Sequence, residues 1–294
     1  MKIGFIGLGR MGSGMVERLL KNKIKVVAFN RSPDKVREII RKGAEGAFSL
    51  SELTNKLGER KIIWMMLPAG SPTDEMIKAI LPLLSKEDII INGANDFYEN
   101  SKKYEKWCGR FDVHFFDCGV SNGIEGLQNG YTLMFGGPKS EFKSIEIFCR
   151  ALAPKNGYGY FGEAGSGHYV KSVHNIIEYV YLQGIAEGIE LLDKGGIDIK
   201  KAISVFRPSS VISSWLLDRA DTAINRPDFS KIDTKIGSVT IDELKKTLKA
   251  AKGYAPAFRA AVKVRESKGN KFKLGKKVIA ATRREFGGHP VSKK

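Results

Sequence analysis

The feature that most constrains this chain is a glycine-rich loop that joins an apolar run to a helical pattern near the N-terminus. The run Ile3–Ile6 is followed by Gly7, Gly9 and Gly12, and Met11–Leu20 then repeats apolar residues at helical intervals. In such a strand–loop–helix unit the first glycine permits the turn, the second lets the backbone approach a pyrophosphate, and the third allows close helix–strand packing. Free N–H groups at the helix start favour an anion. The predicted dinucleotide site comprises Gly7, Leu8, Gly9, Arg10, Met11 and Gly12.

The first half of the chain alternates short apolar runs with helical patterns. After the first run, others occur at Ile24–Phe29, Ile62–Leu67, Ile89–Ile91, Val113–Phe116, Tyr131–Phe135 and Tyr158–Phe161. Alternation of this kind predicts a doubly wound α/β domain, in which helices cover both faces of a parallel sheet.

The pattern changes near Gly165. From Ser166 to Lys194 apolar residues recur at helical spacing without a proline, which predicts one long helix that ends at Gly195-Gly196. Further helices are expected at 198–206, 211–225, 241–252, 255–268 and 272–285. We therefore predict a Rossmann-type domain over residues 1–164, followed by an all-α C-terminal domain over residues 165–294.

Composition narrows the class of protein. With 42% hydrophobic and 28% charged residues the sequence is typical of a globular protein. No apolar run approaches the roughly 20 residues that span a bilayer, and the N-terminus lacks the features of a secretory signal. Three cysteines without CxxC spacing predict neither disulfides nor a zinc ribbon. We expect a cytoplasmic protein that needs no metal and has no membrane partner.

The formal charge of +17 is concentrated at the C-terminal end. Residues 241–294 hold 16 Lys and Arg against 4 Asp and Glu. Such a surplus is compatible with a nucleic-acid or polyanion surface, but charge without a motif is more often a solvated, lysine-rich face. We expect a small anionic substrate and no nucleic-acid partner.

The end of the second predicted strand bears on the choice of cofactor. A site for NAD carries Asp or Glu there, which binds the ribose 2′-hydroxyl. This chain instead has Asn30-Arg31-Ser32, with no acid before Asp34. Because a guanidinium fork suits a 2′-phosphate, we expect NADP rather than NAD. Ser32 before Pro33 is also a good helix N-cap, and both interpretations can hold together.

The start of the long predicted helix, residues 168–179 (HYVKSVHNIIEY), is the most informative stretch. Lys171, Asn175 and Glu178 stand at i, i+4 and i+7 and share one face, beside His174. The opposite, apolar stripe is formed by Val170, Val173, Ile177 and Val180. Next to a cofactor, a lysine whose charged form is destabilised can act as a base and a carboxylic acid as an acid. The alternative is a solvated Lys–Glu face on an amphipathic helix.

Together these motifs resemble the short form of decarboxylating 6-phosphogluconate dehydrogenase, within the β-hydroxyacid dehydrogenase superfamily. Residues 168–179 are similar to the family's substrate helix almost position for position. Further matches are Gly7–Gly12, Asn30-Arg31-Ser32, Leu67-Pro68-Ala69, Gly93-Ala94-Asn95, Val120–Gly123 followed by Gly126 and Gly130, and Phe286–His289. The resemblance spans nearly the whole chain.

The resemblance implies oxidative decarboxylation of 6-phosphogluconate to ribulose 5-phosphate and CO2 with reduction of NADP, a step of the pentose phosphate pathway. Lys171 then takes the proton of the 3-hydroxyl, and Glu178 protonates C1 of the enediol left after decarboxylation. Asn95 bridges cofactor and sugar. The cofactor set is completed by Asn30, Arg31, Ser32, Leu67, Pro68 and Ala69.

The same resemblance implies how the sugar acid is held. Its carboxylate and hydroxyls lie against Ser121, Asn122, Gly123, His174 and Asn175. Tyr179 reaches the phosphate. Arg283 and His289 match tail residues that the family lends to the neighbouring subunit, so a homo-oligomer, at least a dimer, is implied.

Three positions depart from the family's pattern. Asn122 replaces a glycine, Ser213 replaces an arginine, and residues 240–247 replace a glycine-rich segment. In the family, the arginine and the glycine-rich segment that are replaced here normally hold the sugar phosphate. Candidate replacements are Arg207, Lys245 and Lys246. Two alternatives stay open: a β-hydroxyacid dehydrogenase for another, unphosphorylated acid, and a polyanion-binding protein with an inert dinucleotide fold.

Overall fold

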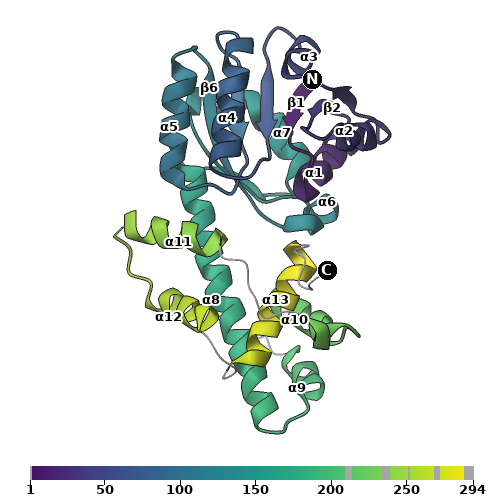
Figure 1. Ribbon diagram of the computed structural model, residues 1–294, viewed down its shortest axis with the longest axis vertical. Helices are drawn as coiled ribbons and strands as arrows, with labels where there is room; N and C mark the ends of the chain where they lie inside the picture. The colour runs from purple at the N-terminus through teal and green to yellow at the C-terminus, as the bar shows by residue number, and fades with distance from the viewer. Residues whose placement is uncertain (1, 209–213, 233–238, 251, 268–271, 288–294) are drawn as a thin grey trace. The chain divides into compact units, whose positions relative to one another are not determined.

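The computed structural model describes residues 2–208, 214–232, 239–250, 252–267 and 272–287, in two compact units, Met1–Ser172 and Val173–Lys294 (Figure 1). The first unit contains an eight-stranded sheet in the order β3-β2-β1-β4-β5-β6-β7-β8. Its strands are β1 (Lys2–Ile6), β2 (Lys25–Phe29), β3 (Glu45–Ala47), β4 (Ile62–Met65), β5 (Ile89–Asn92), β6 (His114–Val120), β7 (Leu133–Gly136) and β8 (Tyr158–Tyr160). All neighbours are parallel except β6 and β7.

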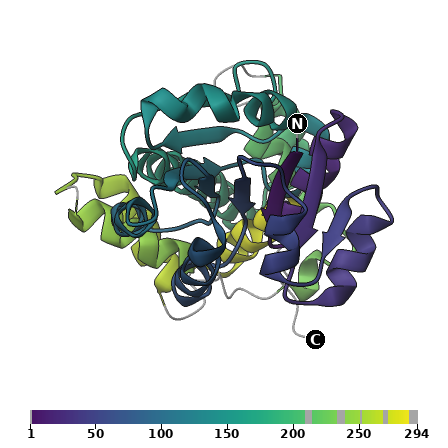
Figure 2. The ribbon, with the colours of Figure 1, turned by 90° about the horizontal axis from the view of Figure 1, so that it is seen from above.

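Two hydrophobic cores flank this sheet, because successive strand residues point to opposite faces. In β4, Ile62 and Trp64 belong to one core, and Ile63 and Met65 belong to the other. Figure 2 shows helices on both sides of the strands. They are α1 (Arg10–Lys21), α2 (Pro33–Ile40), α3 (Leu50–Asn55), α4 (Ser71–Ile80), α5 (Tyr98–Gly109), α6 (Gly126–Asn129) and α7 (Phe142–Leu152).

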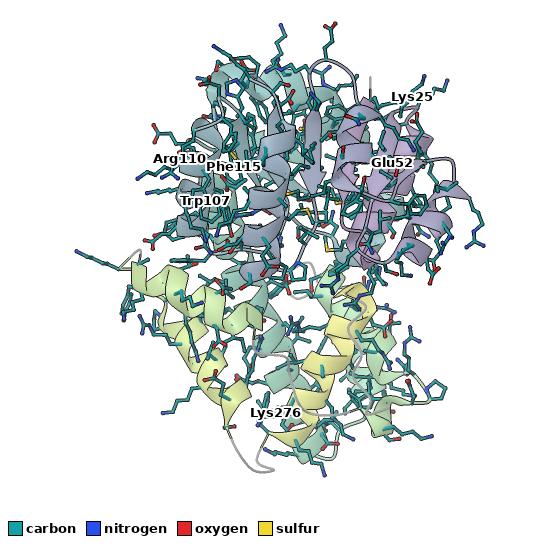
Figure 3. The ribbon with its side chains drawn as sticks, turned by 45° about the horizontal axis from the view of Figure 1, so that its top comes forward. Lys25, Glu52, Trp107, Arg110, Phe115 and Lys276 are labelled. Carbon is teal, nitrogen blue, oxygen red and sulfur yellow. The ribbon has the colours of Figure 1, made fainter. Side chains whose placement is uncertain are left out.

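Aromatic rings join α5 to the sheet. The ring of Tyr104 lies 5.6 Å from that of Trp107 and 5.9 Å from that of Phe115 on β6. Figure 3 labels Trp107 and Phe115. Tyr104 and Phe115 are buried, so this contact helps to pack α5 against the core that contains Ile63 and Met65.

The second unit is helical. Helix α8 (Ser166–Lys194) begins in the first unit and continues into the second. The helices that follow are α9 (Ile199–Phe206), α10 (Trp215–Ile224), α11 (Val239–Ala250), α12 (Pro256–Glu266) and α13 (Lys273–Gly287). One core joins α8, α9, α10 and α13, and another joins α8, α11 and α12 around Tyr179. Within the described residues, no helix is both long enough and apolar enough to cross a membrane.

The fold class predicted from the sequence is confirmed, and the long helix has the predicted bounds. Strand β3 was not predicted, because three residues are too few to show an alternation. The parallel prediction is wrong for the pairing of β7 with β6, since the link from Val120 to Leu133 contains only one 3₁₀ turn (Gly123–Glu125) and the short α6 and provides no full crossover. The two compact units divide after Ser172, and the first turns of α8 dock on β6. The domain boundary expected at residue 164 stays a prediction.

Candidate active site

The glycine-rich loop leaves β1 with the geometry that its spacing predicts. Gly7 has a φ of +98°, which favours glycine, and its N–H donates to the Phe29 carbonyl at 3.0 Å. A Cβ on Gly12 would collide with the Gly7 carbonyl oxygen, whereas a Cβ on Gly9 would meet no atom within 4 Å. Gly9 is the N-cap of α1, so open space lies beside the helix start, where the first N–H groups are not used by the helix's own i to i−4 bonds. The loop therefore offers a pyrophosphate both donors and room. Of its other members, Leu8 is buried, Met11 is half-buried and Arg10 is exposed.

Of the residues after β2, Asn30 and Ser32 have structural roles, whereas Arg31 faces solvent. Asn30 Oδ1 accepts the Leu8 N–H at 3.0 Å, which ties the two loops together. Ser32 is the N-cap of α2, and Pro33 occupies the first turn, as the sequence predicts. Arg31 is exposed and forms no ion pair within the part of the chain that the structure describes. Its guanidinium is therefore available to a phosphate group.

Four loops leave the same edge of the sheet. Ile6 at the end of β1 pairs in register with Phe29 of β2 and with Met65 of β4, and Met65 pairs with Asn92 of β5. Because these strands are parallel and end level, the loops that follow them share one edge, where ligands of open α/β sheets bind. The predicted residues at this edge are Gly7–Gly12, Asn30–Ser32, Leu67–Ala69 and Asn95. Asn95 is exposed there.

Lys171 and Ser121 come together at the end of β6. The Lys171 amine donates to Ser121 Oγ at 3.0 Å, and Ser121 is 8% exposed. The approach of α8 depends on glycine, since a Cβ on Gly119 would collide with the Lys171 side chain and lie 3.0 Å from the Gly167 carbonyl oxygen. The structure thus places a lysine amine at the carboxyl end of a strand in the dinucleotide-binding sheet.

The backbone explains the departure at Asn122. This residue has a φ of +79°, and the following Gly123 has a φ of +48°. Asparagine tolerates this left-handed region better than most residues. Its Nδ2 also donates to the Gly130 carbonyl at 2.8 Å. Asn122 can therefore keep the loop conformation that glycine would provide.

The second unit carries the later residues of the predicted helix. His174 Nδ1 lies 3.3 Å from Asn175 Oδ1. Asn175 and Tyr179 are buried, and Glu178 is half-buried. All four stand on the continuous helix α8, with Glu178 seven residues, or about two turns, after Lys171.

A buried arginine that the sequence analysis missed lies against Tyr179. The Arg265 guanidinium is centred 4.2 Å from the Tyr179 ring, and that of Arg283 is centred 5.4 Å from it. Arg265 donates to Gln183 Oε1 at 3.0 Å and to the Tyr179 carbonyl at 2.6 Å, while its Nη1 has no partner among the described residues. Burial lowers the pKa of Arg265 to about 10. Its position on the buried stripe of α12, after Phe258, Ala261 and Val262, was the available signal.

The three candidate phosphate ligands are engaged with carboxylates. Arg207 lies 2.9 Å from Asp218, Lys245 lies 2.6 Å from Glu266, and Lys246 lies 3.1 Å from Glu243. Ser213, His289 and part of the altered 240–247 segment (the Thr240 side chain) lie outside what the structure describes.

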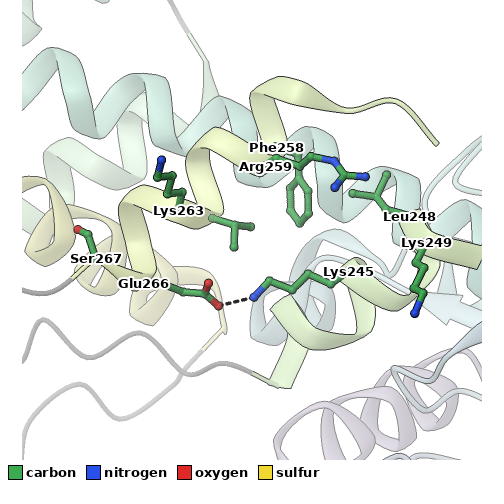
Figure 4. A pocket seen from close by; sticks show the side chains of 9 residues that line it. Lys245, Leu248, Lys249, Phe258, Arg259, Lys263, Glu266 and Ser267 are labelled. Carbon is green, nitrogen blue, oxygen red and sulfur yellow. Dashed lines mark hydrogen bonds and ion pairs between the residues drawn. The ribbon is translucent and has the colours of Figure 1, made fainter. Parts of the chain in front are cut away.

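Part of the C-terminal positive charge borders a groove between α11 and α12. The cavity measures about 720 Å³, and Figure 4 shows its rim of basic side chains. These are Lys245, Lys249, Arg259 and Lys263. Leu248, Phe258 and Val262 form an apolar floor.

One group of side chains has the composition of a metal site. Ligand atoms of Glu87, His114 and Glu141 lie within 4.8 Å of one another. Arg60 already forms an ion pair with Glu141 and holds the pKa of that carboxyl below its ordinary value. His114 begins β6 and Glu87 precedes β5, so this group lies at the edge of the sheet opposite the loops described above.

The fold and the glycine-rich loop first define a class, proteins with a Rossmann-type NAD(P)-binding domain followed by a helical unit. Residues 2–162 match the family profile described as the NAD binding domain of 6-phosphogluconate dehydrogenase. The chain belongs to the 6-phosphogluconate dehydrogenase family, which confirms the resemblance seen in its motifs.

Relatives at similar identity differ in cofactor. The NAD(+)-dependent, decarboxylating 6-phosphogluconate dehydrogenase of Haloferax volcanii is 36% identical over 253 residues, which cover 83% of this chain and 84% of that protein. The NADP(+)-dependent, decarboxylating enzyme of Bacillus subtilis is 32% identical over 252 residues, 82% of this chain and 53% of that protein.

Solved structures agree with the fold. The 6-phosphogluconate dehydrogenase of Plasmodium falciparum superimposes with a TM-score of 0.82 at 25% identity, over 90% of this chain and 61% of that one. The 3-hydroxyisobutyrate dehydrogenase of Mycobacterium tuberculosis gives 0.77 at 18% identity, over 96% and 99%. The latter likeness concerns the fold alone.

Proposed function

We propose that this protein is an NADP-linked dehydrogenase that oxidises 6-phosphogluconate and releases carbon dioxide. The observation that carries the proposal is the contact between Lys171 Nζ and Ser121 Oγ at 3.0 Å. This contact supports the proposal because it holds the Lys171 amine at the carboxyl edge of the sheet, where a hydroxy acid and a nicotinamide ring would meet and where the amine could accept a proton.

Residues of one helix supply the proton transfers. NADP, when bound, supplies the acceptor for the hydride of C3. Lys171 takes the proton of the 3-hydroxyl, and the resulting 3-keto acid loses CO2 because its carbonyl accepts the electron pair of the broken C1–C2 bond. The protonated Lys171 then donates to that carbonyl oxygen. Glu178 protonates the carbon that lost CO2 while Lys171 takes the proton back from the enediol hydroxyl, which yields ribulose 5-phosphate.

The choice of NADP rests on Arg31. It is exposed, it is unpaired within the described chain, and it follows the strand whose end normally carries the acid that selects NAD. A bidentate, charge-assisted pair with a 2′-phosphate would favour NADP.

Two arginines support a phosphorylated substrate. Arg265 and Arg283 both lie over the Tyr179 ring, and Arg265 keeps one buried nitrogen without a partner among the described residues. Two guanidinium groups beside one tyrosine suit a phosphate dianion. Arg265 would take the place of the phosphate ligands that this sequence lacks, beside Arg283, which the family resemblance already implies.

The test is a cofactor-reduction assay with 6-phosphogluconate, gluconate and 3-hydroxyisobutyrate. We expect kcat/KM for 6-phosphogluconate to exceed that for gluconate by about 100-fold or more. Arg283→Ala should reduce that ratio by about 10- to 100-fold without changing the gluconate rate. Arg284→Ala is the matched control, because Arg284 already pairs with Asp228 at 2.7 Å.

Each alternative has its own outcome in this experiment. Gluconate or 3-hydroxyisobutyrate oxidised as fast as 6-phosphogluconate would identify a dehydrogenase for unphosphorylated acids. The groove between α11 and α12 favours the polyanion-binding alternative. Salt-sensitive binding of nucleic acid, without cofactor reduction by any acid, would support that alternative.

We also propose that two copies pair through α8. Exposed apolar residues line one face of this helix, and a Cβ added to Gly184 or Gly188, which lie between them, would meet no atom within 4 Å. The exposed residues are Val173 (40%), Ile177 (63%), Tyr181 (44%) and Leu191 (69%). In a chain with 49 Lys and Arg, residues 172–193 contain neither. An uncharged, glycine-centred face suits close approach of an identical helix about a two-fold axis.

A further inference from the structure

A cluster of buried polar side chains lies beneath the first turn of α8, and the proposed reaction gives it no role. The Ser101 hydroxyl of α5 lies 3.0 Å from His168 Nδ1, and Asp117 Oδ2 of β6 lies 3.9 Å from the same nitrogen. Ser101 and Asp117 are fully buried, and His168 is 1% exposed. The same residue types form hydrolase triads, but no substrate reaches a hydroxyl buried in this way. The cluster therefore acts through the backbone and side chains that it holds in place.

Asp117 caps helix α8 from a distance. Its Oδ1 accepts the Gly165 N–H and its Oδ2 accepts the His168 N–H, both at 2.6 Å. The first N–H groups of a helix have no partner within it, and the positive end of the helix dipole favours an anion there. Asp117 thus fixes where α8 begins.

The same strand then controls the side chain of Lys171. Asp117 and Gly119 stand at alternate positions of β6 and face the same side of the strand, and Ser121 is the first residue after the strand ends. Asp117 holds the first turn, Gly119 leaves room for the Lys171 stem, and Ser121 accepts from the Lys171 amine. Two positions on β6 and the first residue after it therefore determine where α8 starts, where the Lys171 stem lies and what its amine contacts.

Capping α8 with a buried carboxylate costs more free energy than the caps of other helices, because a charged group must be removed from water. Ser49, Asp198 and Ser214 each accept an N–H three residues ahead, near solvent. Burial raises the pKa of Asp117, although His168 and the N–H donors favour its ionised form. Glu105 and Glu163 add further negative charge nearby. A local serine or threonine cap would avoid this cost, so the cost points to a role beyond capping.

We propose that Asp117 is a positioning residue for Lys171. Its carboxylate anchors the first turn of α8 to β6 in the register that brings the Lys171 amine to Ser121. The bond between Ser101 Oγ and His168 Nδ1 braces that turn from α5, and His168 Nε2 has no partner among the described residues. The inference rests on the proposed function, in which Lys171 is the base.

The test compares Asp117→Asn with Asp198→Asn, the same substitution at the cap of α9. Asp117→Asn keeps the shape of the side chain but replaces one acceptor with a donor. We expect kcat to fall by about 10- to 100-fold while KM for NADP stays within about twofold. Asp198→Asn should leave both unchanged, because among the described residues the Asp198 side chain accepts only the Lys201 N–H, at 3.1 Å.

A second readout needs no substrate. The rate at which acetic anhydride acetylates Lys171 at pH 7 is measured by peptide mass spectrometry, with Lys194 as internal reference. Asp117→Asn should accelerate Lys171 labelling by about threefold or more, because it removes a nearby negative charge and loosens the contact with Ser121. If no acid reduces the cofactor with the wild-type protein, the proposed function fails, and the labelling still decides the positioning role.

Ser101→Ala provides a second variant in case Asp117→Asn does not fold. It removes only the brace on His168 and should accelerate labelling in the same direction, to a smaller extent. If Asp117→Asn is not recovered as folded protein, Ser101→Ala decides alone. Unchanged labelling and unchanged kcat in a folded Asp117→Asn protein, or in Ser101→Ala when it is the only variant, would overturn the proposal.

Discussion

Arg31 and Arg37 lie close together in the sequence, yet only one of them is already engaged. Arg37 pairs with Asp34 on the surface of α2 at 2.7 Å, whereas Arg31 has no ion pair within the described residues. Since a surface ion pair contributes little, the difference matters for binding rather than for stability.

Arg31→Ala should therefore lower the preference for NADP over NAD. Loss of a bidentate, charge-assisted contact predicts a fall of about 10- to 100-fold in the ratio of kcat/KM for the two cofactors. Arg37→Ala is the matched control and should leave the ratio unchanged. If the ratio of kcat/KM for NADP to that for NAD is unchanged in Arg31→Ala, Arg31 does not bind the 2′-phosphate.

Lys171 gives the second prediction at this scale. Lys171→Met should reduce kcat by about 10²- to 10⁴-fold, because it removes the base but leaves the glycine-rich loop intact. The dissociation constant of NADP, measured by calorimetry, should stay unchanged. Lys194→Met, near the end of the same helix, should have no effect on turnover. A loss smaller than about tenfold for Lys171→Met would contradict its role as base.

At the scale of elements, α4 and α5 are joined by a partly buried carboxylate. Asp74 lies 2.8 Å from the Lys103 amine and accepts a hydrogen bond from the Tyr104 hydroxyl at 2.5 Å. Burial opposes ionisation of Asp74, but the bonds from Lys103 and Tyr104 outweigh it and hold its pKa below the ordinary value of 3.8.

This lowered pKa predicts a pH-dependent stability. Asp74→Asn should cost about 1–2 kcal/mol of unfolding free energy at pH 7. The contribution of Asp74 is present above pH 3.8 and is lost as the pH falls through its lowered pKa, so wild type and variant should converge in acid. Urea unfolding at pH 7 and pH 3 measures the unfolding free energy of the wild type and of Asp74→Asn. An equal difference at the two pH values would exclude the carboxylate as its source, and Asp34→Asn serves as exposed control.

Elements with strong periodicity were predictable from the sequence, and tertiary contacts were not. The apolar spacing from Ser166 to Lys194 predicts α8 with its observed bounds, because one face of that helix is buried throughout. Asp117 escaped prediction because its two N–H partners lie 48 and 51 residues away. Arg265 escaped because an arginine on an apolar stripe resembles a surface residue until Tyr179 is seen against it.

At the scale of the whole molecule, the exposed face of α8 predicts self-association. Gly188→Leu should abolish pairing without harming the fold, because a side chain there meets no atom of its own chain and leucine favours the helix over glycine. Analytical ultracentrifugation should show a dimer for the wild type and a monomer for the variant. Gly109→Leu, at another open helical glycine, should remain dimeric. A dimeric Gly188→Leu protein would place the interface elsewhere.

Pairing also bears on the active site, because Arg283 lies over Tyr179 of its own chain. This arrangement within one chain predicts that a Lys171→Met chain mixed with an Arg283→Ala/His289→Ala chain stays inactive, whereas the sharing of the tail that the family resemblance implies would restore activity at one site of the mixed dimer. No recovery after confirmed subunit exchange would mean that one chain builds each site.

The most direct test of the central claim follows the carbon that the reaction releases. The wild-type protein is incubated with NADP and 6-phosphogluconate labelled at C1, and labelled CO2 and reduced cofactor are measured together. Oxidative decarboxylation predicts one molecule of labelled CO2 for each molecule of NADPH, with both abolished by Lys171→Met. Reduction of the cofactor with the label retained in the acid would contradict the account.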